Sequence, residues 1–372
     1  MIFRKPVFWI TATLLFIGGL FYSVQVFPKA FAILNVDLKM DREAAFSKSI
    51  KLAEKNNWGP DNYNQVASFS HDTRTQNFVE LDAGGVEKVS LLMQDGLYHF
   101  YTWTVRHYRE HEPNETRISF TPAGDFYGFK ETLAETEKGA TLGAGEARVI
   151  AEYFVQNETS IQLSEFEAIE TSEEVLPSER IDHTFVYQRT KEQIGDGFFR
   201  LKLVVSGDKV TELKHFIKVP EKFSRRFEEM RSANNTLATS ASIAMFLLYG
   251  FGGIILGLFF MMRKRWVVWK QAVYWGFFVA AFGTLGEINF WPLMWMSYPT
   301  ALSEQSFFLQ NIWSMVANTF AMTIIYSLSF MAAETLTRRA FPQQINLWQI
   351  WSKGATSSIQ VLGRTIGGYL MI

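Results

Sequence analysis

The sequence predicts an α+β module inserted between an N-terminal anchor helix and a C-terminal α-helical membrane cluster. Three observations predict this fold class. First, 48% of the 372 residues are hydrophobic, but they gather in the two flanks and leave residues 30–236 polar and charged. Second, that polar stretch contains helix-periodic and alternating segments in succession. Third, the basic clusters beside the apolar runs satisfy a single membrane orientation.

The N-terminal flank contains an uncharged apolar run at residues 7–27, which is long enough to span a bilayer. Arg4 and Lys5 precede it. A cleaved signal peptide is the alternative interpretation. The run is long and no small-x-small cleavage site follows it, so the sequence favours a retained anchor.

Three further spans are expected at about 240–262, 268–296 and 307–333. Basic clusters stand at 263–265 and 338–339, and both must share a side with the basic N-terminus. A cytoplasmic N-terminus followed by four crossings meets this condition. The sequence therefore predicts a protein of the bacterial inner membrane, with residues 30–236 outside the cytoplasm and the lipid bilayer as a partner.

The last residues, about 359–372, are apolar but too short to cross the hydrocarbon core. This predicts either an interfacial segment or the front part of a longer chain, and we favour truncation. Between residues 341 and 354, Ile345, Trp348 and Trp351 alternate with polar residues, which predicts a segment lying along the cytoplasmic surface.

Within the polar stretch, residues 41–56 and 145–157 are expected to be helices, and Asp41 is a plausible N-cap of the first. The acidic cluster Glu165, Glu167, Glu170, Glu173 and Glu174 is interpreted as a solvated connector between helix and sheet. Alternating segments predict strands. They lie at 78–81, 98–105, 117–120, 183–188, 199–205 and 210–219.

The two halves of this stretch look related. Residues 117–120, followed by Gly124-Asp125, align without gaps to residues 200–203, followed by Gly207-Asp208. A helix followed by a β-meander with a Gly-Asp turn resembles the PepSY-type domain, although two unrelated amphipathic hairpins could give the same pattern. The predicted organisation is anchor 1–29, first α+β unit 30–138, second α+β unit 139–222, juxtamembrane helix 223–238, three membrane helices 239–338, and a cytoplasmic amphipathic loop with the start of a membrane helix 339–372.

One motif could carry chemistry. His107, Glu110 and His111 match the H-x-x-E-H pattern, which on a helix would let two imidazoles share zinc. Here the pattern follows an alternating strand and precedes the turn residues 112–114, so the sequence predicts a charged hairpin tip and no metal site. The remaining histidines before residue 216 have no ligand spacing and are expected at the surface or half buried: His71, His99, His183 and His215.

The membrane spans contain a few polar side chains of interest. Glu287 and Asn289 lie in the third span, where a carboxylate costs several kcal/mol unless it faces a partner or a wet cavity. A functional carboxylate and a structural one are equally open interpretations of Glu287. Gly283 and Gly286 beside it would permit close approach of another helix.

The absence of cysteine and a net charge of −1 give no signature of thiolate metal or nucleic-acid binding.

Glu334 lies near the cytoplasmic end of the fourth span, and its partner could be Arg338, one turn later, or Arg364. Residues 221–235 and 331–370 resemble the front portion of long bacterial CPBP-family proteins, which are CAAX-protease-like intramembrane metalloproteases. The resemblance implies a catalytic glutamate pair with an arginine four residues on. Only Glu334 and Arg338 match this pattern, and Ala333 occupies the position of the other glutamate.

The resemblance also implies two later histidine-containing spans, but no histidine follows His215. No catalytic set or cofactor is therefore expected in this chain, and zinc only in a downstream core or another polypeptide. The first hypothesis is a sensory or substrate-gating front half of such a protease, partnered by that core or by a peptide substrate. The second is a stand-alone membrane sensor or binding protein. A transporter component is weaker, because no inverted repeat is visible.

Overall fold

The computed structural model describes residues 5–342, 349–350 and 352–370. It divides into two compact units, and each is considered by itself. One unit, which we call the β module, consists of Pro28–Glu228 and Trp291–Phe308. The other contains the remaining described residues, most of them in long apolar helices. The segment with Ile345, Trp348 and Trp351 lies outside the described residues.

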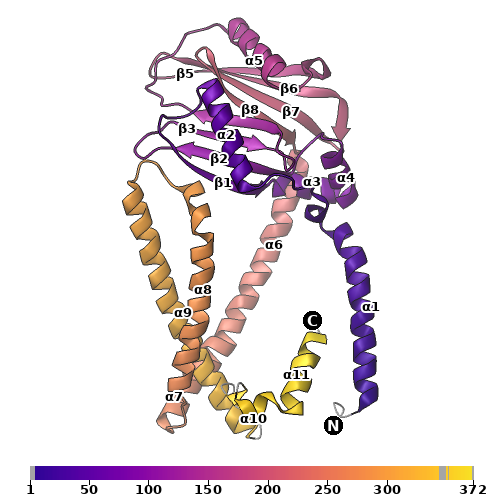
Figure 1. Cartoon of the computed structure of the whole chain (residues 1–372), viewed down its shortest axis with the longest axis vertical. Coiled ribbons are helices and arrows are strands. Elements are labelled where there is room, and N and C mark those ends of the chain that lie inside the picture. The colour runs from indigo at the N-terminus through magenta and orange to yellow at the C-terminus, as the bar shows by residue number, and fades with distance from the viewer. Residues whose placement is uncertain (1–4, 343–348, 351, 371–372) are drawn as a thin grey trace. The chain divides into compact units, whose positions relative to one another are not determined.

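The β module is built on one antiparallel sheet with the strand order β1-β2-β3-β4-β8-β7-β6-β5 (Figure 1). Each half of the sheet is a four-stranded meander, and β4 joins β8 at the centre. The predicted α+β class is confirmed, whereas the kinship of the two halves stays a prediction. The strands are β1 Asn64–His71, β2 Tyr101–Tyr108, β3 Glu115–Phe120, β4 Phe126–Thr132, β5 Phe166–Val175, β6 Ile181–Ile194, β7 Gly197–Ser206 and β8 Lys209–Lys218.

Four helices of the β module pack on the sheet or beside its end. They are α2 Arg42–Asn56, α3 Thr73–Asp82, α4 Gly85–Gln94 and α5 Ala144–Glu158, with short 3₁₀ turns at Ala32–Asn35 and Leu163–Glu165. Both predicted helices are confirmed. Asp41 caps α2, since its carboxylate accepts a hydrogen bond from the Ala44 amide at 2.8 Å.

The hydrophobic core has two parts on one sheet face. Alanines of α2 and α5, such as Ala45 and Ala151, are fully buried against strand residues such as Ile118 and Leu203. Small side chains let these helices approach the sheet closely. A second cluster, which includes Phe78, joins α3 and α4 to residues near the ends of β6, β7 and β8. The opposite face carries mainly serine, threonine and charged side chains, as in antiparallel sheets with one solvated face.

Two local predictions are wrong. Residues 78–81 form the end of α3 and not a strand; Asp72 caps this helix by accepting from the Thr75 amide at 3.2 Å. A four-residue apolar run cannot distinguish a strand from a buried helical turn. Glu165 lies in the turn after α5 as part of a connector, but Glu167, Glu170, Glu173 and Glu174 lie on the exposed edge strand β5. Like charges on an edge strand oppose pairing with other chains.

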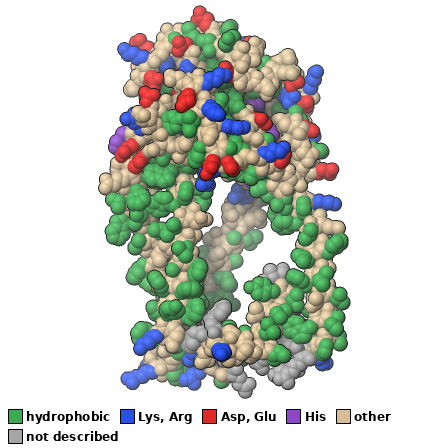
Figure 2. Space-filling view, viewed as in Figure 1, with side chains coloured by type: hydrophobic (Ala, Val, Ile, Leu, Met, Phe, Trp, Pro, Cys, Tyr) green, Lys and Arg blue, Asp and Glu red, His purple; other side chains and the backbone are tan. Residues whose placement is uncertain are grey.

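Within the described residues, four helices are long and apolar enough to cross a membrane: Pro6–Ala30, Glu221–Arg263, Lys270–Ser297 and Glu304–Ala340. The first is α1; the second comprises α6 Glu221–Met245, a π-helical segment Phe246–Leu256 and α7 Gly257–Arg263; the third is α8 Lys270–Met294 with the turn Trp295–Ser297; the fourth is α9 Glu304–Ala340. Figure 2 shows hydrophobic side chains covering these helices and charged side chains gathered over the β module. Short helices follow at Lys353–Thr356 (α10) and Ile359–Leu370 (α11).

Candidate functional site

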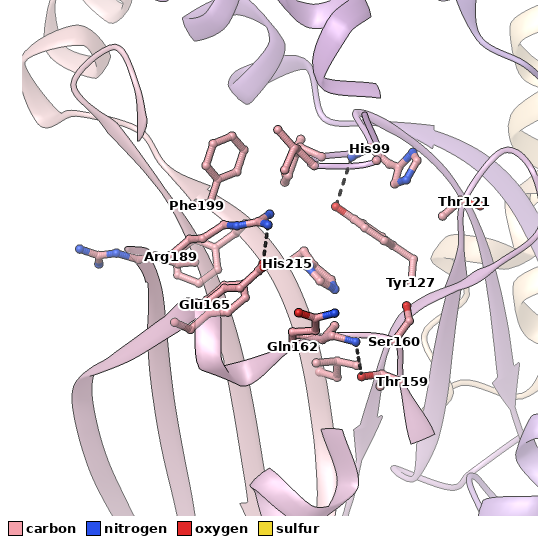
Figure 3. A pocket seen from close by; sticks show the side chains of 18 of the residues that line it. His99, Thr121, Tyr127, Thr159, Ser160, Gln162, Glu165, Arg189, Phe199 and His215 are labelled. Carbon is pink, nitrogen blue, oxygen red and sulfur yellow. Dashed lines mark hydrogen bonds and ion pairs between the residues drawn. The ribbon is translucent and has the colours of Figure 1, made fainter. Parts of the chain in front are cut away.

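The two halves of the sheet meet at a short seam. β4 and β8 pair at Phe129 with Leu213 and at Lys130 with Glu212. A Cβ on Gly128 would lie 2.4 Å from the Leu213 carbonyl oxygen, so only glycine permits this approach. Beside these pairs a pocket of about 410 Å³ opens, which we call the seam pocket (Figure 3). Its lining comes from both halves of the sheet.

Three aromatic rings cross the seam. Tyr127 of β4 stacks on His215 of β8, with ring centroids 4.6 Å apart, and meets His99 edge-on at 5.2 Å. The Tyr127 hydroxyl accepts a hydrogen bond from the His99 backbone amide at 3.3 Å. In Figure 3 the Tyr127 ring lies between the two imidazoles. The stack therefore connects residues that are far apart in sequence.

The surroundings keep both imidazoles of the pocket neutral near pH 7. Burial lowers the pKa of His215 to about 4, and the neighbouring His99 and Arg189 lower it further. Burial also lowers the pKa of His99, against the opposing effect of Asp125. Burial raises the pKa of the Tyr127 hydroxyl, which stays protonated. The ring stack is thus a neutral set of donors and acceptors.

The opposite wall of the seam pocket carries an ion pair. Arg189 Nη2 lies 2.5 Å from Glu165 Oε2, and its guanidinium lies 5.8 Å from the ring centroid of Phe166. Arg189 Nε also contacts Glu192. Thr190 Oγ1 donates to the Glu165 carbonyl at 3.1 Å, which ties the end of β6 to the turn before β5. The wall presents a positive and a negative group side by side.

Uncharged polar groups complete the lining. Thr159, Ser160 and Gln162 follow the C-terminus of α5, and Thr159 Oγ1 accepts from the Ile161 amide at 3.2 Å (Figure 3). Thr121 contributes from the turn after β3. Because these residues sit on turns anchored to secondary structure, their hydroxyl and amide groups are held at the pocket edge.

A second polar arrangement joins the sheet to the loop at residues 295–303, which connects α8 to α9. The Arg106 side chain on β2 is only 4% exposed and donates to the carbonyl oxygens of Trp295, Met296 and Tyr298 at 3.1, 3.3 and 2.8 Å. Its Nε donates to Glu115 at 2.8 Å. Tyr298, 1% exposed, packs against aromatic and aliphatic side chains of β1 and β2.

Two of the three H-x-x-E-H residues, Glu110 and His111, take part in the same contact. Glu110 Oε1 accepts a hydrogen bond from the Glu304 amide at 3.1 Å, which places a carboxylate at the N-terminus of α9. The His111 amide donates to the Thr300 carbonyl at 2.7 Å. His107 instead points into the core, where Ser49 lies 3.1 Å from its Nε2. The predicted strand and hairpin are confirmed, but His107 is buried on β2 and does not lie at the charged tip, where Glu110 Oε1 is 3.5 Å from His111 Nε2.

The other predicted site residues lie in the membrane unit. Asn318 Nδ2 of α9 donates to Glu287 Oε1 of α8 at 2.6 Å. Asn289 is exposed on α8, and Arg364 lies on α11. Arg338 Nε donates to Glu334 Oε1 at 3.0 Å, which forms the pairing predicted one helical turn apart.

Sequence reasoning missed the seam pocket and the Arg106 contact. His99 and His215 were expected as ordinary histidines, and the fully buried His183 departs from that expectation too. The alternation of β4 and β8 could have placed Tyr127 and His215 on the core face, but not opposite each other. Among the described residues, no group of histidine, aspartate and glutamate side chains is arranged to hold a metal ion. Comparison with family models, curated proteins and solved structures finds no match to this chain.

Proposed function

We propose that this chain is a multi-pass protein of the bacterial inner membrane whose extracytoplasmic β module senses a ligand and gates a membrane-embedded partner. The proposal combines three elements: the apolar helices, the seam pocket and the contact between the sheet and the α8–α9 loop. That contact carries the proposal, because it connects a ligand-sized pocket to two membrane helices through one sheet.

The orientation rests on two independent arguments. The basic clusters at 263–265 and 338–339 favour a cytoplasmic location for one end of both α8 and α9. If both helices cross the bilayer, their connecting loop lies outside the cytoplasm. Arg106 and Glu110 of the β module bind this loop and the start of α9. The β module must then lie outside as well, in agreement with the orientation of α1.

The contact is suited to transmitting a change in the sheet. Three carbonyl oxygens share one buried guanidinium, and Glu115 neutralises it at 2.8 Å. Charge-assisted hydrogen bonds in a buried site are directional, so a shift of β2 would move the loop with it. β2 and β4 both pair with β3, which relates the contact to the seam.

A cross-link tests the contact in membranes. The chain has no cysteine, so paired cysteines can be introduced without background. Asn64 and Glu304 hydrogen-bond through their side chains, and Asn64→Cys with Glu304→Cys should join rapidly through a short bis-maleimide. The control pairs Asn64→Cys with Val175→Cys, at the other edge of the sheet. Equal yields in the two pairs would contradict the proposal.

The finer proposal is that the partner is a CPBP-type intramembrane metalloprotease core outside residues 1–372. Its support is the sequence resemblance at 221–235 and 331–370 and the Glu334–Arg338 pair. Purification from native membranes followed by mass spectrometry tests it. The purified sample is expected to contain the glutamate pair and the membrane histidines, either on a longer form of this polypeptide or on a second chain. Its absence from a stable, ligand-responsive preparation would instead favour the stand-alone sensor, for which the seam pocket is the supporting observation.

A further inference from the structure

We propose that the seam pocket binds a small zwitterion of amino-acid or dipeptide size, with Arg189 holding its carboxylate and Glu165 its ammonium group. This inference deepens the proposed function, because it names the class of ligand that the β module would sense. The observation behind it is the adjacent guanidinium and carboxylate on one wall of a pocket whose lining also includes aromatic rings and uncharged polar groups.

The paired charges of the wall favour a ligand with no net charge. Arg189 and Glu165 supply one charge of each sign there, whereas Arg200 alternates along β7 with the core residues Phe199 and Leu201 and donates to Gln188. The histidines add no charge near neutral pH, because burial lowers the pKa of His215 to about 4. A polyanion such as a nucleotide would leave charge uncompensated, and so would a polyamine. A zwitterion brings one charge of each sign and matches the wall.

Arg189 and Glu165 can both bind a ligand while the ion pair between them stays intact. A guanidinium has five N–H donors, and the ion pairs to Glu165 and Glu192 engage Nη2 and Nε. Donors therefore remain for a ligand carboxylate. A carboxylate has about four acceptor positions, so Glu165 can bind Arg189 and an ammonium group together. The nearby Phe166 ring, which already faces the Arg189 guanidinium, also suits a cation.

The size and the remaining lining restrict the ligand further. A pocket of about 410 Å³ is at the small end of the range of small-molecule sites, about 300–1,000 Å³. Phe199, Tyr127 and His215 provide aromatic surface for an apolar side chain, and Gln162 and Ser160 provide hydrogen bonds for a peptide group (Figure 3). An amino acid or dipeptide with an aromatic side chain satisfies all of these features.

The test is calorimetric titration of the full chain in nanodiscs with L-phenylalanine and with the dipeptide Ala-Phe. At least one of these zwitterions should bind, and binding of one alone assigns the ligand to amino acids or to peptides. For Ala-Phe, N-acetylation or C-terminal amidation should each weaken binding at least tenfold, which corresponds to about 1.4 kcal/mol. Equal affinity of blocked and free forms, or no binding of either zwitterion at millimolar concentration, would overturn the inference.

Substitutions of pocket residues test whether the zwitterion binds in the seam pocket. Arg189→Gln and Glu165→Gln should each weaken the zwitterion at least tenfold. Arg225→Gln is the matched control, because it removes an equivalent ion pair, to Glu221, on the exposed surface of α6. Should Arg189→Gln unfold, Gln162→Ala and the blocked ligands on the unaltered protein still decide the question. Unchanged affinity in the folded pocket variants refutes the inference, while the Asn64–Glu304 cross-link separately reports on the proposed function.

Discussion

Replacing Arg106 by methionine should release the α8–α9 loop from the sheet. Methionine retains much of the aliphatic volume but donates no hydrogen bond. The change leaves the carbonyl oxygens of Trp295, Met296 and Tyr298 without their donor and leaves Glu115, whose side chain is 17% exposed, without its buried partner.

The size of the effect follows from these contacts. Breaking a buried ion pair by removing one partner costs about 3–5 kcal/mol, because the other charge stays desolvated. Glu115 keeps a second partner, since Arg117 Nε lies 3.0 Å from its Oε1, which places the expected cost at the lower end. A loss of about 3 kcal/mol corresponds to roughly a hundredfold increase in local opening.

Hydrogen exchange measures this opening directly. The amides of His111 and Glu304 are protected by the Thr300 carbonyl and the Glu110 carboxylate. Both should exchange about a hundredfold faster in Arg106→Met, whereas amides in α2 should not change. Mass spectrometry of peptides covering 109–112 and 295–304 resolves the two regions.

Arg117→Met is the matched control. Arg117 binds the same Glu115, but its side chain is 42% exposed. A partly exposed pair contributes about 1 kcal/mol or less. Equal acceleration in the two variants, or unchanged exchange in Arg106→Met, would refute the reasoning that the buried arginine holds the loop.

Three further predictions concern the seam, the core and the start of α9. Gly128→Ala should destabilise the β module by about 1–3 kcal/mol in thermal unfolding, because its Cβ would lie 2.4 Å from the Leu213 carbonyl; Gly145→Ala, with open space around it, should not. Burial lowers the pKa of His107 to about 4, so the neutral form stabilises the fold above about pH 6.5, and up to about 3 kcal/mol is lost as the pH falls toward 4. Acid unfolding measures this, and His107→Gln should flatten the dependence between those pH values. Glu110→Gln should cost about 0.5–2 kcal/mol and raise exchange in the first turn of α9, since it weakens the acceptor at that helix N-terminus; unchanged exchange would count against the capping role.

Local signals predicted much of the fold. Asp41 followed by an amphipathic run predicts α2, and alternation predicts β2, β3, β7 and β8, because capping and strand periodicity act over a few residues. The same signals fail for Phe78 and Val79, whose burial depends on a core assembled from β6, β7 and β8. They fail also for β5, which is an exposed edge strand with little apolar alternation.

The site depends on pairing between distant segments. His99, Tyr127 and His215 acquire a common role only when β4 joins β8, and nothing in the sequence near each residue encodes that register. The acceptors of Arg106 are backbone carbonyls, which every residue has. Sequence reasoning also missed Asn318 as the hydrogen-bond partner of Glu287, because Asn318 lies on the next helix. The only partners named were two arginines, and they were named for Glu334.

Cysteine accessibility tests the central claim, that the β module lies outside the cytoplasm. The cysteine-free chain allows single probes at Tyr153, 67% exposed on α5, and at Arg263, the exposed last residue of α7. With a membrane-impermeant maleimide on intact spheroplasts, Tyr153→Cys should be labelled at once and Arg263→Cys only after lysis. Labelling of Arg263→Cys in intact spheroplasts, with Tyr153→Cys protected until lysis, would contradict the account.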